Sequence, residues 1–162
     1  MSAGRSSSAA SPREEPADEL LITRIFDAPR ELVFAAFTKN EHLAHWQGAP
    51  QGFTTTVEKS DIRPGGEFLI CMHAPDGVDH WLQGVYREVV PPSRLVFTHA
   101  WLDAEKNPKK ETLVVITFAD KGGKTELTLR QTGLVSAASR DGHATGWEST
   151  FDRLQDYLET IR

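Results

Sequence analysis

The sequence predicts an α+β fold in which a curved antiparallel sheet of six to seven strands wraps around a long C-terminal helix. Two observations predict it. From Phe53 to Thr132 the chain alternates short apolar-polar runs with turn residues, as strands of an antiparallel sheet do. The last segment instead carries an apolar stripe at helical spacing, made of Trp147, Phe151, Leu154, Leu158 and Ile161. Such a stripe needs an apolar surface to cover, and the inner face of the sheet provides one.

Two turn motifs support hairpins within this sheet. In DIRPGG at 61–66, Pro64 fixes φ for the first central turn position, and Gly65 supplies the positive φ that a type II turn needs next. Pro91 and Pro92 cannot donate hydrogen bonds to a neighbouring strand, so they end one strand before the next begins. Both motifs therefore predict a change of chain direction.

The N-terminal part predicts one strand and two short helices. Residues 20–27 are apolar and β-branched, which favours a strand. Pro29 lies where a helix starts, because its missing N–H has no helical partner there. Thr38 and Glu41 form a capping box that predicts a second helix ending near Trp46, before the breaking sequence GAPQG. The first helix should bury Val33, Ala36 and Phe37.

Six further strands are predicted before the last helix. They cover residues 53–60, 67–74, 80–90, 95–101, 112–119 and 126–132. Their alternation puts His99, Trp101 and Gln131 on the inner face beside apolar side chains. A buried His or Gln must find a hydrogen-bond partner. A wet cavity or a side-chain network in a filled core meets that need, and both interpretations stay open.

Composition limits the classes of function. The 162 residues suit one domain, predicted at 20–162 after a disordered tail at 1–19 that lacks the apolar core of a secretory signal. A net charge of −5 argues against nucleic acid and anionic membranes as partners. No apolar run approaches the roughly 18 residues that span a bilayer. The single cysteine, Cys71, excludes an intrachain disulfide and favours the cytoplasm.

Several segments together resemble a known family. They are FDAPRELVFAAFT at 26–38, HLAHW at 42–46, DIRPGG, GVYREVVPPSRLVFT at 84–98 and GHATGW at 142–147. The chain is similar, over residues 20–162, to homologues of the activator of the 90-kDa heat-shock-protein ATPase. This family lies in the SRPBCC superfamily, also called START or birch-pollen-allergen-like, which has the helix-grip fold.

The resemblance implies a cavity between the sheet and the C-terminal helix, used in the superfamily for lipids, polyketides and other apolar molecules. It also implies two other functions. The family's eukaryotic namesake binds a chaperone, partly through an additional N-terminal domain that has no counterpart in the single domain predicted here. A few superfamily members are cyclases or hydrolases.

The predicted function is therefore binding of a hydrophobic or aromatic small molecule, lipid- or polyketide-like, in that cavity. Trp147 is the strongest candidate, with His143 one helical turn before it. Gly146 costs about 1 kcal/mol relative to Ala in a helix, which a close approach or an unobstructed opening explains. Trp46 is expected to close the mouth of the cavity. The predicted lining residues are Trp46, Phe68, Ile70, Met72, Phe97, His99, Trp101, Leu129, Gln131, His143, Trp147 and Phe151.

Two rival functions remain. A chaperone-binding module would use an outer face of the protein, as a monomer or a homodimer. An enzyme of the cyclase or hydrolase type would use the same cavity, with His99 and His143 as acid and base, although nothing in the sequence brings these two side chains together. No residue is assigned as catalytic.

Neither a metal nor a cofactor is predicted. His42 and His45 lie three apart on a short helix, but there is neither an HExxH motif nor a cysteine-histidine cluster. His73 and His80 flank a turn and should be solvated, and Cys71 should be a small buried side chain. The charged residues of the turn motifs are expected to form ion pairs that brace the hairpins; they are Asp61, Arg63, Glu67, Glu88 and Arg94.

Overall fold

A computed structural model describes residues 18–46 and 52–161. Within these residues it contains seven strands and three helices. In chain order they are β2 (Glu19–Phe26), α1 (Arg30–Thr38), α2 (Asn40–Trp46), β3 (Thr54–Ser60), β4 (Glu67–His73), β5 (Asp79–Val90), β6 (Arg94–Trp101), β7 (Thr112–Lys121), β8 (Lys124–Thr132) and α3 (Ala137–Ile161). The predicted α+β class, the order of elements and the two short helices after the first strand are confirmed.

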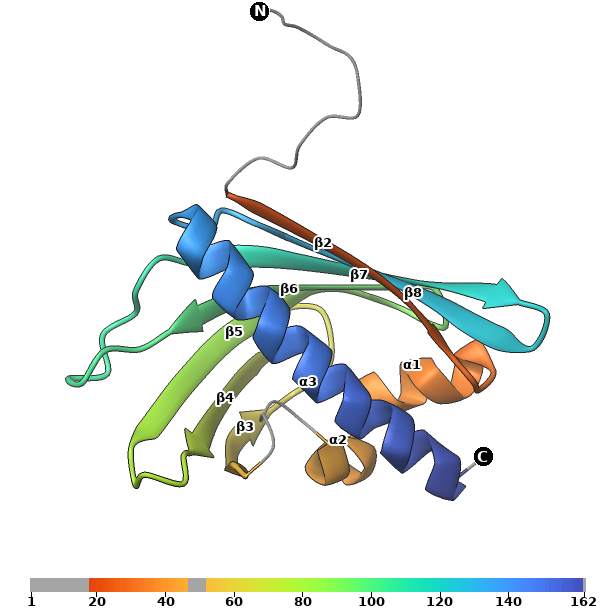
Figure 1. The fold of residues 1–162 in the computed structure, drawn as a ribbon, viewed down its shortest axis with the longest axis horizontal. Coiled ribbons are helices and arrows are strands. Elements are labelled where there is room, and N and C mark those ends of the chain that lie inside the picture. The colour runs from red at the N-terminus through yellow and green to blue at the C-terminus, as the bar shows by residue number, and fades with distance from the viewer. Residues whose placement is uncertain (1–17, 47–51, 162) are drawn as a thin grey trace, which may run out of the picture.

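The strands form one antiparallel sheet in the order β2-β8-β7-β6-β5-β4-β3. From β3 to β8 each strand pairs with the next in the chain, and β2 then pairs with β8. Figure 1 shows the sheet curving around α3, with α1 and α2 near the C-terminal half of that helix. The helix-grip fold is therefore confirmed. Among the described residues, no helix is long and apolar enough to cross a membrane.

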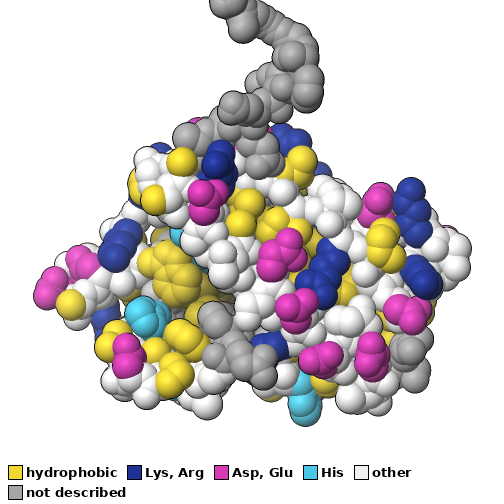
Figure 2. Space-filling model, viewed as in Figure 1, with side chains coloured by type: hydrophobic (Ala, Val, Ile, Leu, Met, Phe, Trp, Pro, Cys, Tyr) yellow, Lys and Arg dark blue, Asp and Glu magenta, His cyan; other side chains and the backbone are white. Residues whose placement is uncertain are grey.

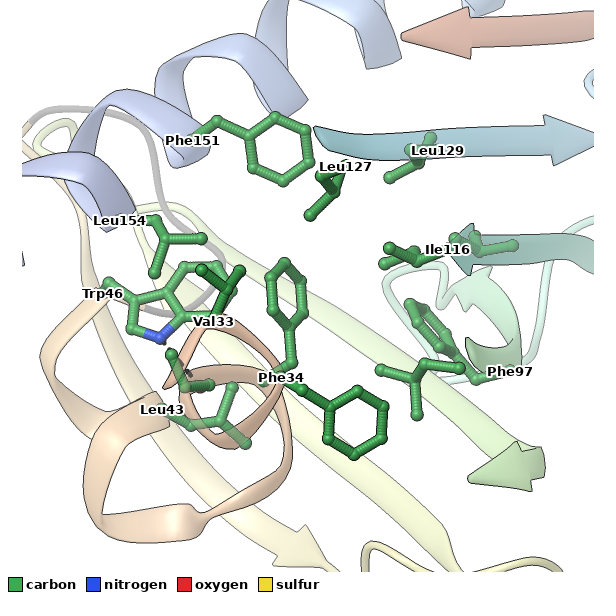
Figure 3. Packing of buried hydrophobic residues seen from close by; sticks show 14 of the residues in the cluster. Val33, Phe34, Leu43, Trp46, Phe97, Ile116, Leu127, Leu129, Phe151 and Leu154 are labelled. Atoms are coloured by element: carbon green, nitrogen blue, oxygen red, sulfur yellow. Dashed lines mark hydrogen bonds between the residues drawn. The ribbon is translucent and has the colours of Figure 1, made fainter. Parts of the chain in front are cut away.

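The core lies between the concave face of the sheet and the helices. Phe151, Leu154 and Leu158 of α3 are fully buried, and Figure 3 shows Phe151 and Leu154 pointing inward from the helix. Burying a side chain of this size stabilises the fold by about 1.5–3 kcal/mol. In α1 the predicted inward residues Val33, Ala36 and Phe37 are also buried. The apolar stripes of both helices thus face the sheet as predicted.

The predicted type II turn at Pro64 and Gly65 is present. Gly65 has φ 85°, and the backbone N–H of Gly66 donates to Arg63 O at 2.8 Å. A Cβ atom on Gly66 would lie 1.9 Å from Asp61 O, so this position has no room for a side chain. Gly65 N–H also donates to Tyr86 O at 2.8 Å, which holds the turn against β5.

Two predictions at element boundaries are wrong. Thr38 does not open α2, because it is the last residue of α1 and its hydroxyl donates to Phe34 O at 2.9 Å. The carbonyl of Lys39 accepts from the N–H groups of His42 and Leu43, each at 3.0 Å, so α2 starts directly after Lys39 and not after a Thr38–Glu41 capping box. The first strand also begins one residue before its predicted start, since Glu19 of the predicted tail pairs with Thr132 in the sheet. Residues 1–17 of that tail and residues 48–51 of GAPQG lie outside the described residues.

The charged residues of the turns form ion pairs, as predicted. Arg63 contacts Asp61 at 3.0 Å, Arg94 contacts Glu88 at 3.0 Å, and Lys59 contacts Glu67 at 3.3 Å. All are solvent-exposed, where such a pair contributes about 0–1 kcal/mol. They brace the hairpins only weakly.

Candidate ligand-binding cavity

A cavity of about 430 Å³ lies between the N-terminal half of α3 and the strands β4, β5 and β6. Figure 2 shows it as a hollow lined by hydrophobic side chains, with histidine at its edge. None of the wall residues in the described part of the chain is Lys, Arg, Asp or Glu. The walls are Phe53, Met72, His80, Leu82, His99, Trp101, Ser139, Gly142, His143, Gly146, Trp147 and Thr150.

The predicted lining residues fall into three groups. The cavity wall contains Met72, His99, Trp101, His143 and Trp147. A smaller inner space of about 70 Å³ is bordered by Trp46, Phe68, Ile70 and Phe97, and shares His99, Leu82, Trp147 and Thr150 with the cavity. The third group borders neither space and is fully buried in the core; it consists of Leu129, Gln131 and Phe151.

Trp46 does not close the mouth of the cavity. Its side chain is buried in the core, its ring packs against Phe37 at a centroid distance of 4.7 Å, and its Nε1–H donates to Ala36 O at 3.0 Å. This hydrogen bond satisfies the only polar atom of the indole ring, so the whole ring is stable in the interior. Trp46 therefore packs α2 against α1, and it does not have the predicted position at the mouth of the cavity.

His143 is held by two hydrogen bonds on opposite ring nitrogens. Trp101 Nε1–H donates to His143 Nε2 at 3.1 Å, and because an indole nitrogen only donates, Nε2 must be the unprotonated nitrogen. Nδ1 then carries the proton and donates to Ser139 O at 2.7 Å. His143 is thus a neutral ring that fixes Trp101 of the sheet against α3.

A second network explains why Gln131 is buried. Trp147 Nε1–H donates to Gln131 Oε1 at 2.9 Å, which identifies that atom as the amide oxygen. The amide nitrogen donates to Thr112 Oγ1 at 2.9 Å and points to His99 Nδ1 at 3.4 Å. Thr112 in turn donates to His99 O at 2.9 Å. Of the two interpretations left open by the sequence, a side-chain network is the one that satisfies Gln131.

His99 retains one unpaired donor in this network. Because Nδ1 faces the Gln131 amide donor, the ring proton lies on Nε2. In residues 18–46 and 52–161 we find no hydrogen-bond acceptor for this Nε2–H. The His99 residue is only 5% exposed and forms part of the cavity wall. Burial and, to a smaller extent, the neighbouring His143 together lower the pKa of His99 to about 3, so the ring is a neutral donor at pH 7.

Two glycines of α3 shape the cavity. Gly142 and Gly146 lie one helical turn apart in its wall. Within the described residues, a Cβ atom on either glycine would lie more than 4 Å from every atom beyond its chain neighbours and the nearby backbone of α3. Close packing therefore does not require them, and of the two explanations that the sequence left open for Gly146, the unobstructed opening fits the structure. Both positions leave volume for a ligand at a cost in helix stability.

The structure brings His99 and His143 together, with ring centroids 5.8 Å apart. Their chemistry does not suit an acid-base pair near pH 7. Both nitrogens of His143 are occupied by Trp101 and Ser139, and the pKa of His99 is far below neutrality. In this arrangement the two rings form part of the cavity wall.

Several wall residues were not among those predicted. They are Phe53, His80, Leu82, Ser139, Gly142 and Thr150. His80 and Leu82 lie directly across from Met72 and Ile70 in the β4–β5 pairing, a register that the sequence does not specify. Ser139 and Thr150 lie four residues from His143 and Gly146, so helical spacing was an available indication for them.

The fold and the cavity define a helix-grip protein that encloses an uncharged, mainly apolar space. Residues 27–159 match the family model described as Activator of Hsp90 ATPase homolog 1-like protein. The chain belongs to this family, within the SRPBCC superfamily, as its motifs indicated.

Solved structures support the same fold. Protein CV1439 from Chromobacterium violaceum is 29% identical, with a TM-score of 0.80 over 88% of this chain and 97% of that one. Protein Ms6760 from Mycobacterium smegmatis is 26% identical, with a TM-score of 0.75 over 88% and 91%. The AHSA1 protein SPO3351 from Silicibacter pomeroyi, 23% identical with a TM-score of 0.80 over 89% and 99%, shares the fold. No curated protein matches the chain.

Proposed function

We propose that this protein binds a neutral, largely apolar small molecule, lipid- or polyketide-like, in the cavity between the sheet and α3. The observation that carries the proposal is a cavity of about 430 Å³ whose described walls hold no ionic side chain and one buried hydrogen-bond donor, His99 Nε2–H, without an acceptor among the described residues. Ligand pockets usually measure about 300–1,000 Å³ and combine apolar walls with a few placed polar groups. This cavity has both properties.

The charge of the walls supports a neutral ligand. A carboxylate or an amine placed here would lose its hydration without gaining an opposite charge, since no ionic side chain borders the cavity in the described residues. His99 cannot supply a positive charge at neutral pH, because its pKa is about 3. Its Nε2–H suits a carbonyl or ether oxygen, and the rings of Trp101 and Trp147 suit an aromatic or aliphatic body.

The test is an amide NMR titration of the full chain with a panel of lipids, flavonoids and polyketide-like aromatics. We expect shifts concentrated at residues 139–150 and at the wall positions of β4, β5 and β6. Trp147→Ala should weaken binding at least tenfold, whereas Leu113→Ala, an exposed residue of β7 outside the cavity, should leave it unchanged. A folded protein whose spectrum is unchanged by every member of the panel would contradict the proposal.

A second candidate is activation of a chaperone ATPase, which the description of the matching family suggests. Such a protein would act in the cytoplasm, as a monomer or a homodimer, through an outer surface. The test is the rate of ATP hydrolysis by a purified 90-kDa heat-shock protein with and without the full chain. Stimulation that survives Trp147→Ala would assign function to an outer surface; an unchanged rate would reject this candidate.

A further inference from the structure

A separate cluster of chemically reactive side chains lies on the opposite face of the sheet from the cavity. Cys71 and His73 are two residues apart on β4, so both point to the same face, and Asp79 of β5 pairs directly with His73. The residues that alternate with them, Met72 and His80, border the cavity. The register of the β4–β5 hairpin thus brings a thiol, an imidazole and a carboxylate together.

Three ligand-type atoms converge in this cluster. His73 Nδ1 lies 2.7 Å from Asp79 Oδ1 and 3.8 Å from Cys71 Sγ, and the three atoms are all within 4.8 Å of one another. The other ring nitrogen of His73, Nε2, is 2.8 Å from Thr56 Oγ1 on β3. Among the described residues, this is the only group of three His, Cys, Asp or Glu side chains that meets so closely.

The arrangement does not suit a catalytic cysteine. In a cysteine-histidine-carboxylate relay, the thiol and the carboxylate contact opposite nitrogens of the imidazole, so that the carboxylate orients the base. Here Cys71 and Asp79 both contact Nδ1. Burial raises the pKa of the Cys71 thiol, and the Asp79 carboxylate raises it further, which disfavours a free thiolate. Convergence on a single point is instead the geometry of metal ligation.

We propose that Cys71 Sγ, His73 Nδ1 and an oxygen of Asp79 form a binding site for a divalent zinc-type cation, with a fourth position open to water. Zinc accepts sulfur, nitrogen and oxygen ligands at about 2.0–2.3 Å in a tetrahedron. Cys71 is buried whereas His73 and Asp79 are partly exposed, so the ion reaches the thiolate from the solvent side. The mixed sulfur, nitrogen and oxygen set favours zinc over magnesium or calcium.

The protons balance as follows. On binding, the thiol proton of Cys71 passes to solvent, and Nδ1 of His73 must carry no proton, so the ring proton lies on Nε2. Thr56 Oγ1 then accepts a hydrogen bond from Nε2–H and holds the ring in place, as partners of metal-bound histidines commonly do.

The site has a structural consequence for the cavity. A cation held between β4 and β5 would tie together the two strands that present Met72 and His80 to the cavity wall. The metal would brace one side of the cavity without contacting its contents. This inference is independent of the proposed function, because it concerns the outer face of the hairpin.

The test uses the full chain, freed of metal with a chelator and then titrated with zinc alone by calorimetry and with cobalt alone by absorption. We expect one equivalent of each ion to bind, with a near-ultraviolet sulfur-to-cobalt band that reports thiolate ligation. Cys71→Ser should abolish that band and weaken zinc binding at least tenfold. His73→Gln and Asp79→Asn should also weaken zinc binding at least tenfold.

The matched controls are His80→Gln, on the opposite face of the same hairpin, and the double variant His42→Gln, His45→Gln on α2. Both should bind zinc as the original chain does. The proposal is overturned if cobalt gives no sulfur band, or if zinc affinity is unchanged in a folded Cys71→Ser protein. It is also overturned if the α2 double variant alone removes the binding.

Discussion

At the scale of single residues, the interior depends on how each buried polar atom is satisfied. Gln131 is fully buried and links Trp147, Thr112 and His99 through its amide group. These bonds fix two residues of the cavity wall and determine which nitrogen of His99 carries the proton. The Gln131 amide thereby determines that His99 presents an N–H donor to the cavity.

Replacing Gln131 should measure the value of this network. Gln131→Met keeps the approximate volume but leaves Trp147 Nε1–H without its acceptor, so we expect a loss of about 1–3 kcal/mol in the free energy of unfolding. Urea denaturation checks it. The control is Gln83→Met on the outer face of β5, which should change stability by less than about 0.5 kcal/mol. Equal effects of the two changes would show that the network contributes nothing.

His99 should make stability depend on pH. Its pKa is about 3 in the folded protein and roughly 6.5 when unfolded, so between these values only the unfolded chain is protonated. The contribution of neutral His99 is fully present above pH 6.5 and is lost as pH falls toward 3, with a slope of up to about 1.4 kcal/mol per pH unit. Urea denaturation at pH 4.5, 5.5 and 6.5 measures that slope.

The comparison for this pH dependence is His99→Gln, which cannot titrate. The slope of the variant over pH 4.5–6.5 should be shallower than that of the original chain by up to about 1.4 kcal/mol per pH unit. Parallel slopes in the two proteins would mean that His99 is not held neutral by burial.

At the scale of elements, the two halves of α3 have different tasks. The C-terminal half buries Phe151, Leu154 and Leu158 completely against the sheet and the short helices. The N-terminal half carries Gly142 and Gly146 and borders the cavity. The C-terminal half of α3 therefore packs the helix against the core, whereas the N-terminal half borders the open space beside the sheet.

Gly142 and Gly146 should lower the stability of the protein while they widen the cavity. Gly142→Ala and Gly146→Ala each add a methyl group that meets no other part of the described chain within 4 Å, so each should raise the free energy of unfolding by up to about 1 kcal/mol. The same methyl groups narrow the cavity and should weaken binding of the best ligand in the panel. Urea denaturation and the NMR titration measure the two effects. A loss of stability in both variants would contradict the open geometry.

At the scale of the whole molecule, the buried side chains in the C-terminal half of α3 should contribute more to the free energy of unfolding than surface ion pairs do. Leu154→Ala removes a fully buried side chain between the helix and the core, and we expect a loss of about 2–5 kcal/mol in the free energy of unfolding. The surface change Arg94→Ala, which breaks only an exposed ion pair with Glu88, should cost less than about 1 kcal/mol. Similar losses in the free energy of unfolding for the two variants would mean that packing of α3 against the sheet contributes little to stability.

The sequence alone determined the α+β class, the order of elements and most inward positions, because these depend on local properties. Alternation along a strand and helical spacing place residues such as Ile70, Val114 and Leu158 without knowledge of their partners. The Pro64–Gly65 turn was predictable for the same reason, since its φ values are properties of those two residues. The Thr38 capping box failed because the helix preceding it used the same residue for its own last turn.

Only the tertiary structure decided which residues form the cavity. Inward-facing Leu129 and Phe151 satisfy the same pattern as Met72 and Trp147, yet the former lie in the packed core and the latter border open space. Because α3 contacts β2 and α2, the space that stays open beside β4, β5 and β6 depends on contacts between parts of the chain that are far apart in the sequence. The sequence could not predict that Cys71, His73 and Asp79 lie close together, because this depends on the register in which β4 pairs with β5.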